Sequence, residues 1–233
     1  YRSPVDKKDL HQVFPGNKDG TITERIAYTI TDKIIKKSDY YIDMHSGEFN
    51  EQVCDFVSYL YDCPNADLCN KSKKLALATG NKYLIPYRFN SGPDNYSDVS
   101  AIQLGVAALF LVWGDSGIVK PEELELCKKS ILNVMRTIKM LEGEAIINKH
   151  PIYLTEQKTL TGNYSGIFYP LVKKEQYVRK GMLLGYTTDY FGNILEEFVS
   201  PISGLVFAVY NGPTINKGEQ AVFVAKVNDE SEE

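Results

Sequence analysis

Residues 21–47 read TITERIAYTITDKIIKKSDYYIDMHSG, and this stretch decides the fold class. Thr21 stands three residues before Glu24, which is the spacing of a capping box at a helix start. The second half is rich in tyrosine and isoleucine and ends at His45, as a strand does where a loop follows. The residues between Thr21 and that strand predict an amphipathic helix, because the isoleucines recur at helical spacing: Ile22, Ile26, Ile30, Ile34 and Ile35. A helix leading into a strand predicts an α/β fold.

The same alternation continues through the first two thirds of the chain. Residues 99–117, VSAIQLGVAALFLVWGDSG, continue a helix that begins near Ser97 and lead into a buried strand that stops at Gly114. A long helix is expected in residues 120–141, with Pro121 near its first turn. Residues 49–95 are rich in Tyr, Asn, Gly and Pro, so we expect an irregular excursion over the working edge of the sheet.

The last part of the chain has a different sequence pattern. Residues 165–227 read as short alternating strands separated by Gly and Pro, and a rhythm of SG, strand, turn and KG occurs twice. We expect a small all-β barrel or sandwich here, similar to lipoyl and biotinyl carrier modules. The hairpin between its halves reads DYFGN and lacks the modifiable lysine, so a swinging-arm role is not expected. The predicted division is an α/β domain at 1–150, a β module at 151–228 and an acidic tail at 229–233.

Composition narrows the classes of partner. The 233 residues are 43% hydrophobic and 24% charged, with a net charge of −4 and scattered lysines and arginines. We therefore expect a soluble protein with a small-molecule substrate, without nucleic-acid or membrane partners. The start YRSPVDKKDL is not a signal peptide, and its polar, Met-free character is typical of a fragment or a processed form. Self-association and the compartment, cytoplasmic or periplasmic, stay open.

The cysteines leave two interpretations open. Cys54, Cys63 and Cys69 crowd one stretch, at spacings that match neither a zinc ribbon nor a CxxC redox pair. A local disulfide would suit a secreted or periplasmic protein, whereas reduced thiols are the simpler expectation.

His45 is the first candidate for chemistry, because strand ends are where open α/β sheets place their sites. Asp43 lies two residues earlier on the same face of the predicted strand, from where a carboxylate orients a metal-bound imidazole. A single histidine in this position is more often structural than a ligand. One histidine and one aspartate do not complete a zinc site, which takes three protein ligands and an open position.

Several motifs together resemble the succinylglutamate desuccinylase/aspartoacylase family of zinc carboxypeptidase-like deacylases. The stretch KDLHQVFPGNKDGTITERIAYTI is similar to the family pattern DLNR-FPG followed by ER-A, and YIDMHSG is similar to its DLHSG motif. GVAALFLVWGDSG is similar to the family's GIPALTVELGG-G. The resemblance runs over nearly the whole chain and into the β module.

This resemblance implies a zinc-carboxypeptidase-like three-layer sandwich with a mixed sheet, followed by a barrel-sandwich module. It also implies a zinc-dependent hydrolase that removes an acyl group from an N-acyl amino acid or similar small amide. His45 matches the family's histidine ligand of the single zinc ion, with Asp43 beside it. The other ligands belong to a family segment without a counterpart here, so either they lie outside this sequence or this form cannot bind the metal as the family does.

The chain departs from the family pattern at functional positions. The Asn-Arg pair that holds a substrate carboxylate is matched by His11 and Gln12, and a neutral Gln does not replace the bidentate guanidinium. The catalytic Glu is matched by Val112, which removes general acid–base catalysis. Asp115 is the nearby candidate to take its place, although closing the Gly114–Gly117 turn is its simpler role.

Two functions follow from these observations. The first is a zinc-dependent amidohydrolase that binds its substrate at His11 and Gln12. The second is a catalytically impaired relative that keeps the fold as a small-molecule or protein binding module. Tyr83, Tyr87 and Arg88 are further candidates for substrate contact.

Overall fold

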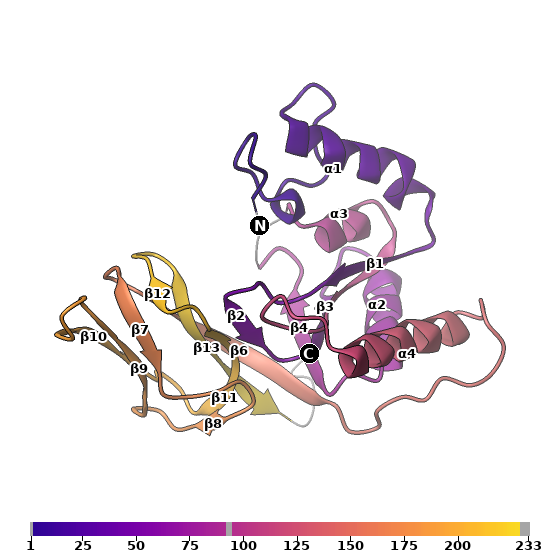
Figure 1. Cartoon of the computed structure of the whole chain (residues 1–233). Coiled ribbons are helices and arrows are strands. Elements are labelled where there is room, and N and C mark those ends of the chain that lie inside the picture. Colours follow the sequence, from indigo (N-terminus) through magenta and orange to yellow (C-terminus); the bar gives the residue numbers. More distant parts are fainter. Residues whose placement is uncertain (1, 92–94, 229–233) are drawn as a thin grey trace.

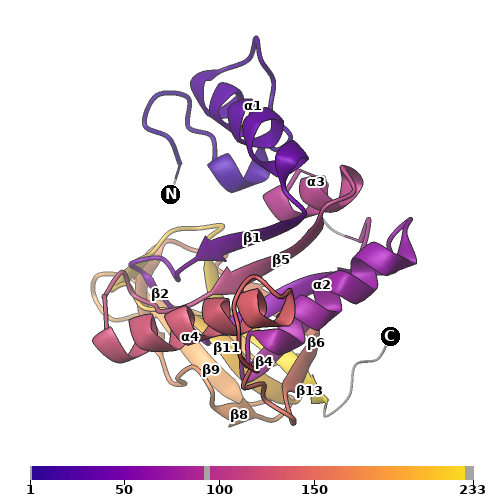
Figure 2. The same cartoon turned by 90° about the vertical axis from the view of Figure 1, so that its right-hand side faces the viewer.

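The computed structural model describes residues 2–91 and 95–228. These residues form a mixed α/β fold with a nine-stranded mixed sheet and a second, four-stranded antiparallel sheet. Figure 1 shows the small sheet on the side of the molecule away from the helices, and Figure 2, turned by 90°, shows α2 and α4 in front of the strands and α1 and α3 beyond β1. Among the described residues, no helix has both the length and the apolar character needed to cross a bilayer.

The stretch that opens the chain's α/β region folds as predicted. Helix α1 is Ile22–Lys33 and strand β1 is Tyr40–His45. The capping box is present, and the Glu24 carboxylate accepts a hydrogen bond from the Thr21 backbone N–H at 2.8 Å. The isoleucine stripe is only partly covered, because Ile22, Ile26 and Ile34 stay 42%, 43% and 54% exposed. The helix instead packs through Ala27 and its neighbouring threonines.

Strand β5, Ala107–Val112, lies beside β1 in parallel and places Val112 opposite His45. Helix α3, Ser97–Gln103, precedes β5, and helix α4, Pro121–Thr137, follows it, as expected. Alternate β5 side chains face opposite layers. Leu109 and Leu111 join the core shared with α2 and α4, whereas Ala108 packs with residues of α1 and α3.

The predicted irregular excursion at 49–95 is wrong. The segment holds β2 (Glu51–Val53), β3 (Phe56–Tyr61), α2 (Ala66–Ala78) and β4 (Tyr83–Arg88). Strands β3 and β4 lie in the middle of the long sheet, with β3 antiparallel to β5 and parallel to β4. Pro86 is tolerated in β4 because the pairing with β6 involves only Tyr83 and Leu84, so no ladder bond to β6 is lost.

The C-terminal strands supply both the end of the long sheet and the small sheet (Figure 1). Strands β6 (Ile152–Thr161), β13 (Gln220–Asn228), β11 (Gly204–Tyr210) and β8 (Tyr177–Val178) continue the long sheet beyond β4. Strands β10 (Ile194–Val199), β9 (Leu183–Thr188), β7 (Gly166–Pro170) and β12 (Thr214–Ile215) form the small one. Side chains of both sheets, among them Phe168, Leu184 and Val222, share one core.

The long sheet runs across the predicted boundary near residue 150. Strand β4 pairs with β6, and β2 pairs with β11 with Val53 opposite Ala208. The division at residue 150 therefore stays a prediction about folding units, while the two parts share one sheet. The predicted acidic tail, residues 229–233, lies outside the described residues.

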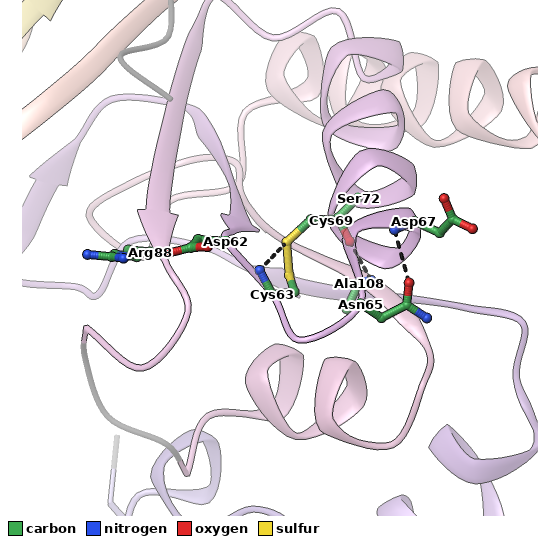
Figure 3. The surroundings of a disulfide bond; sticks show 8 residues. All are labelled: Asp62, Cys63, Asn65, Asp67, Cys69, Ser72, Arg88 and Ala108. Carbon is green, nitrogen blue, oxygen red and sulfur yellow. Dashed lines mark hydrogen bonds and ion pairs between the residues drawn. A yellow bond between two sulfur atoms is a disulfide. The ribbon is translucent and has the colours of Figure 1, made fainter.

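Cys63 and Cys69 are joined by a disulfide, so the expectation of reduced thiols is wrong for this pair. The bond ties the end of β3 to the first turn of α2, and Figure 3 shows it beside Asn65, which caps that helix by accepting from the Asp67 N–H. The Cys63 backbone N–H also donates to the Cys69 sulfur. Cys54 and Cys127 are free thiols.

Candidate metal and substrate site

Asp43 lies between two imidazoles at the carboxyl end of β1. Its carboxylate oxygens are 3.1 Å from His11 Nδ1 and 3.0 Å from His45 Nε2. The Ser97 hydroxyl, at the start of α3, donates to the same carboxylate. Three polar groups therefore converge on one partly buried anion.

Local structure explains how these groups meet. Strand alternation puts Asp43 and His45 on one face of β1, as predicted. His11 comes from a short 3-10 helix, Leu10–Gln12, whose first turn is capped by the Asp9 carboxylate accepting from the His11 N–H at 3.0 Å. The buried Phe14 anchors that segment to the core shared with α1 and α3.

Aromatic rings fix the orientation of both imidazoles. The His11 ring stacks on Tyr96 with 4.3 Å between centroids. Phe110, opposite Asp43 in the β1–β5 register, lies 4.5 Å from the His45 ring and 5.2 Å from the His11 ring. These contacts restrict the rings before any ligand binds.

The Asp43 carboxyl is an anion at neutral pH. Burial by itself raises its pKa, but the hydrogen bonds from His11, His45 and Ser97 outweigh burial and hold the pKa well below the ordinary value. A buried carboxylate that stays charged is suited to bind or orient a cation.

A cavity of about 850 Å³ adjoins the cluster. His11 and Gln12, the predicted substrate contacts, both line it, as does Tyr87. Aromatic rings from both parts of the chain form much of the remaining wall: Phe56, Tyr96, Phe110, Phe207, Tyr210 and Phe223. The charged residues that line it are Arg2, Glu48, Glu51, Asp98 and Glu219. The cavity has the size and mixed lining of a small-molecule site.

The cluster fits a zinc ion by the chemistry of its donors. His11, Asp43 and His45 offer two imidazole nitrogens and one carboxylate oxygen, all within 4.8 Å of one another. Two histidines and one carboxylate, with one open position, are a common ligand set of catalytic zinc. The sequence pointed to His45 as the sole ligand in the chain, whereas the folded chain places two more donors beside it.

Asp115 lies in a different environment. It is 5% exposed, lies 3.3 Å from the Lys120 ammonium and forms a second ion pair with Lys174. Burial raises its pKa, but the lysines outweigh burial and keep the pKa below the ordinary value. Asp115 is not among the residues that line the cavity, so its catalytic role gains no support from geometry.

Val112 is buried in an apolar cluster with Val53 and Phe207. The end of β5 thus carries no carboxylate beside His45. Of the other predicted substrate contacts, Tyr83 is buried and Arg88 is paired with Asp62 beyond the cavity lining.

Two polar elements of the cavity were missed from the sequence. Asp98 is 1% exposed in the first turn of α3 and accepts a hydrogen bond from the Tyr87 hydroxyl. Glu51 begins β2, inside the segment that we expected to be irregular. An acidic residue at a helix start was the available signal for Asp98, while nothing in the local pattern singled out Glu51.

Known proteins resemble this chain in sequence and in fold. No family model matches the chain. The chain is 25% identical over 232 residues to N-alpha-acetyl-L-2,4-diaminobutyric acid deacetylase of Halomonas elongata, which covers 97% of this chain and 67% of that protein.

Solved structures of other proteins resemble this chain over nearly its whole length. The product-bound ectoine utilization protein EutE (DoeB) of Ruegeria pomeroyi has a TM-score of 0.87 at 21% identity, covering 97% of this chain and 69% of that one. A succinylglutamate desuccinylase of Silicibacter sp. TM1040 also has a TM-score of 0.87 at 21% identity, covering 97% and 70%. A succinylglutamate desuccinylase/aspartoacylase of Rhodobacter sphaeroides has a TM-score of 0.84 at 21% identity, covering 98% and 70%. The resemblance to the succinylglutamate desuccinylase/aspartoacylase family is thereby confirmed, in fold over nearly the whole chain and in sequence to a deacetylase.

Proposed function

We propose that this protein is a zinc-dependent hydrolase that cleaves the amide bond of an N-acyl amino acid or a similar small amide. The observation that carries the proposal is the His11–Asp43–His45 cluster beside the 850 Å³ cavity. The deacetylase with 25% identity supports the reaction class, because its name describes removal of an acyl group from an amino acid. The carboxypeptidase-like layering and the barrel-sandwich form of the C-terminal strands are part of the same proposal.

The cluster residues would hold the metal. A bound zinc ion supplies Lewis-acid polarisation of the amide carbonyl and lowers the pKa of a water molecule. Asp43 keeps both imidazoles oriented through its two oxygens. Phe110 limits water on one side of the rings, which strengthens the electrostatic interactions of the site.

Substrate recognition falls to the cavity wall. His11 and Gln12 stand where the resemblance places a carboxylate-binding pair, and Gln12 offers an amide in place of a guanidinium. Gln12 therefore binds a substrate carboxylate less strongly than an arginine fork does. The large aromatic share of the wall suits a substrate with an apolar part.

One observation favours the second candidate, a catalytically impaired relative that binds a small molecule in the same cavity. Val112 cannot accept or donate a proton, and it occupies the end of β5 beside His45. Metal binding without hydrolysis would support this function.

The two candidates are separated by one set of measurements. The whole chain is purified under gentle conditions, its metal content is measured, and hydrolysis is followed on N-acetyl and N-succinyl derivatives of aspartate, glutamate and 2,4-diaminobutyrate. Stoichiometric zinc with turnover of one derivative supports the hydrolase. Absence of metal after zinc reconstitution would contradict it.

The three histidines provide an internal control. His11→Gln and His45→Gln are expected to lose zinc, because each removes a donor of the cluster. His150→Gln should retain zinc, because that exposed residue lies outside the cluster. Equal zinc content in all three variants would refute the cluster as the metal site.

A further inference from the structure

The proposed hydrolysis needs a group that accepts a proton from water and returns it to the leaving nitrogen. At the end of β5 the buried Val112 cannot do this. Asp115 is held by Lys120 and Lys174 and does not line the cavity. The carboxylates that line the cavity are the natural candidates for this role: Glu48, Glu51, Asp98 and Glu219.

Three of these four carboxylates are engaged or exposed. Asp98 accepts the Tyr87 hydroxyl and is almost completely buried. Glu219 accepts the Asn216 backbone N–H at 2.7 Å and its side-chain amide at 3.1 Å, which holds the turn between β12 and β13. Glu48 is exposed on the loop after β1.

Glu51 differs from them because it is half-buried and its backbone is fixed on both sides. It pairs with Tyr210 of β11, and its carbonyl accepts the Ser116 N–H at 2.9 Å. The Gly47 N–H donates to the Gly114 carbonyl at 2.9 Å. These bonds fasten the segment between His45 and Glu51 to the turn after β5, which is the end of the strand that carries Val112.

Glu51 and His11 of the cluster line the same cavity. Phe110, which contacts the rings of His11 and His45, lines the same cavity as Glu51. Phe56 lies 6.0 Å from Phe110 and extends this aromatic floor. A substrate held in this cavity would therefore be bounded by a wall that includes both His11 and Glu51.

The environment of Glu51 suits proton transfer in both directions. Burial raises the pKa of its carboxyl, outweighing the hydrogen bond from the Glu48 backbone. A pKa nearer to neutrality improves a group that must first accept and then donate a proton.

We infer that Glu51 is the catalytic proton carrier of the proposed hydrolysis, in the role that Val112 cannot fill; this inference rests on the proposed function. The water oxygen bonds to the amide carbonyl carbon, and one water proton passes to the Glu51 carboxylate. Glu51 then gives that proton to the nitrogen as the carbon–nitrogen bond breaks. The second water proton stays on the new carboxyl group, so the products are a carboxylic acid and an amine, which exchange that proton to become a carboxylate and an ammonium ion at neutral pH. Glu51 returns to its starting charge.

The test compares Glu51→Gln with Asp55→Asn. Asp55 is a matched control because its carboxyl also has a pKa raised by burial, accepts the Gly114 N–H at 2.9 Å and does not line the cavity. Glu51→Gln should lower kcat by at least about 10²-fold with zinc content and KM retained, whereas Asp55→Asn should change kcat by less than about threefold. Glu51→Asp, which keeps the carboxyl, should retain the pH dependence of kcat/KM that Glu51→Gln loses.

A second measurement does not depend on turnover. The NMR signal of the Glu51 carboxyl carbon is assigned by its loss in Glu51→Gln. In the metal-free protein, its titration should give a pKa above the ordinary glutamate pKa of about 4.3. The signal should also shift when the best substrate of the panel is added.

The outcomes separate the inference from the function on which it rests. An active wild type with an equally active Glu51→Gln variant overturns the role of Glu51 and leaves the hydrolase standing. A zinc-loaded wild type that cleaves none of the panel overturns the hydrolase, and the role of Glu51 with it. A Glu51 signal that titrates as in water and ignores the substrate also overturns the inference.

Discussion

His45 and Val112 lie opposite each other on the parallel strands β1 and β5. One side chain belongs to the His11–Asp43–His45 cluster, whereas the other is buried among apolar residues of β2 and β11. The two neighbours therefore face environments of opposite polarity.

Val112→Glu is expected to destabilise the protein without supplying a proton carrier. A carboxyl placed among Val53 and Phe207 loses its hydration without gaining a partner, which should lower the free energy of unfolding by roughly 2–4 kcal/mol. Urea denaturation measures the change, with Val112→Ile as the apolar control. Unchanged stability of Val112→Glu would mean that water reaches this position.

Asp43→Asn should weaken zinc binding about 10- to 100-fold or more, because the variant loses the anion that contacts both imidazoles. Competition with a chromophoric chelator measures the affinity. Asp39→Asn, an exposed residue just before the same strand, should leave the affinity unchanged. Equal affinities in the two variants would remove Asp43 from the site.

Asp115→Asn should lower the free energy of unfolding at pH 7 by about 2 kcal/mol, because it leaves Lys120 and Lys174 without their buried anion. Urea denaturation measures the loss. Glu125→Gln, which breaks an exposed pair with Lys128, should cost less than about 0.5 kcal/mol.

The same aspartate predicts a pH dependence. Its pKa is lower in the folded protein than in the unfolded chain, so the stabilisation is present above about pH 4 and is lost as the pH falls through the folded pKa. The difference in unfolding free energy between wild type and Asp115→Asn should therefore shrink at pH 3. A constant difference from pH 7 to pH 3 would contradict the ion-pair account.

Replacing both Cys63 and Cys69 by serine should lower the free energy of unfolding by about 2 kcal/mol, as expected for a short closed loop. Unfolding is measured with and without a reductant. The reductant should destabilise the wild type and leave the double variant unchanged. Cys127→Ser, which removes a free thiol, should keep the wild-type sensitivity to reductant.

Strong local sequence patterns made the elements on either side of segment 49–95 predictable. The capping box of Thr21 and Glu24, the strand end at His45 and the apolar strand before Gly114 each carry a signal within a few residues. The segment 49–95 carried weaker signals. Strand β4 contains a proline, and the buried face of helix α2 includes the polar Ser72, so neither element shows an uninterrupted apolar period.

Only part of the site could be predicted from the sequence, for a related reason. Asp43 and His45 are two residues apart on one strand, and alternation alone places them together. His11 is 32 residues from Asp43 in sequence, and its position depends on how the segment before α1 packs. Glu51 reaches the cavity through the pairing of β2 with β11, which no local pattern encodes.

The pairing of β2 with β11 constrains the order in which parts of the protein can fold. Val53 meets its partner Ala208 only after residues 54–208 have been synthesised, so β2 must wait without its neighbour on the ribosome. Closing so long a loop makes the final pairing slow compared with the local helices. The segment that carries Glu51 is therefore among the last to take its final place, and catalytic competence should appear later than the bulk of the helical structure during refolding.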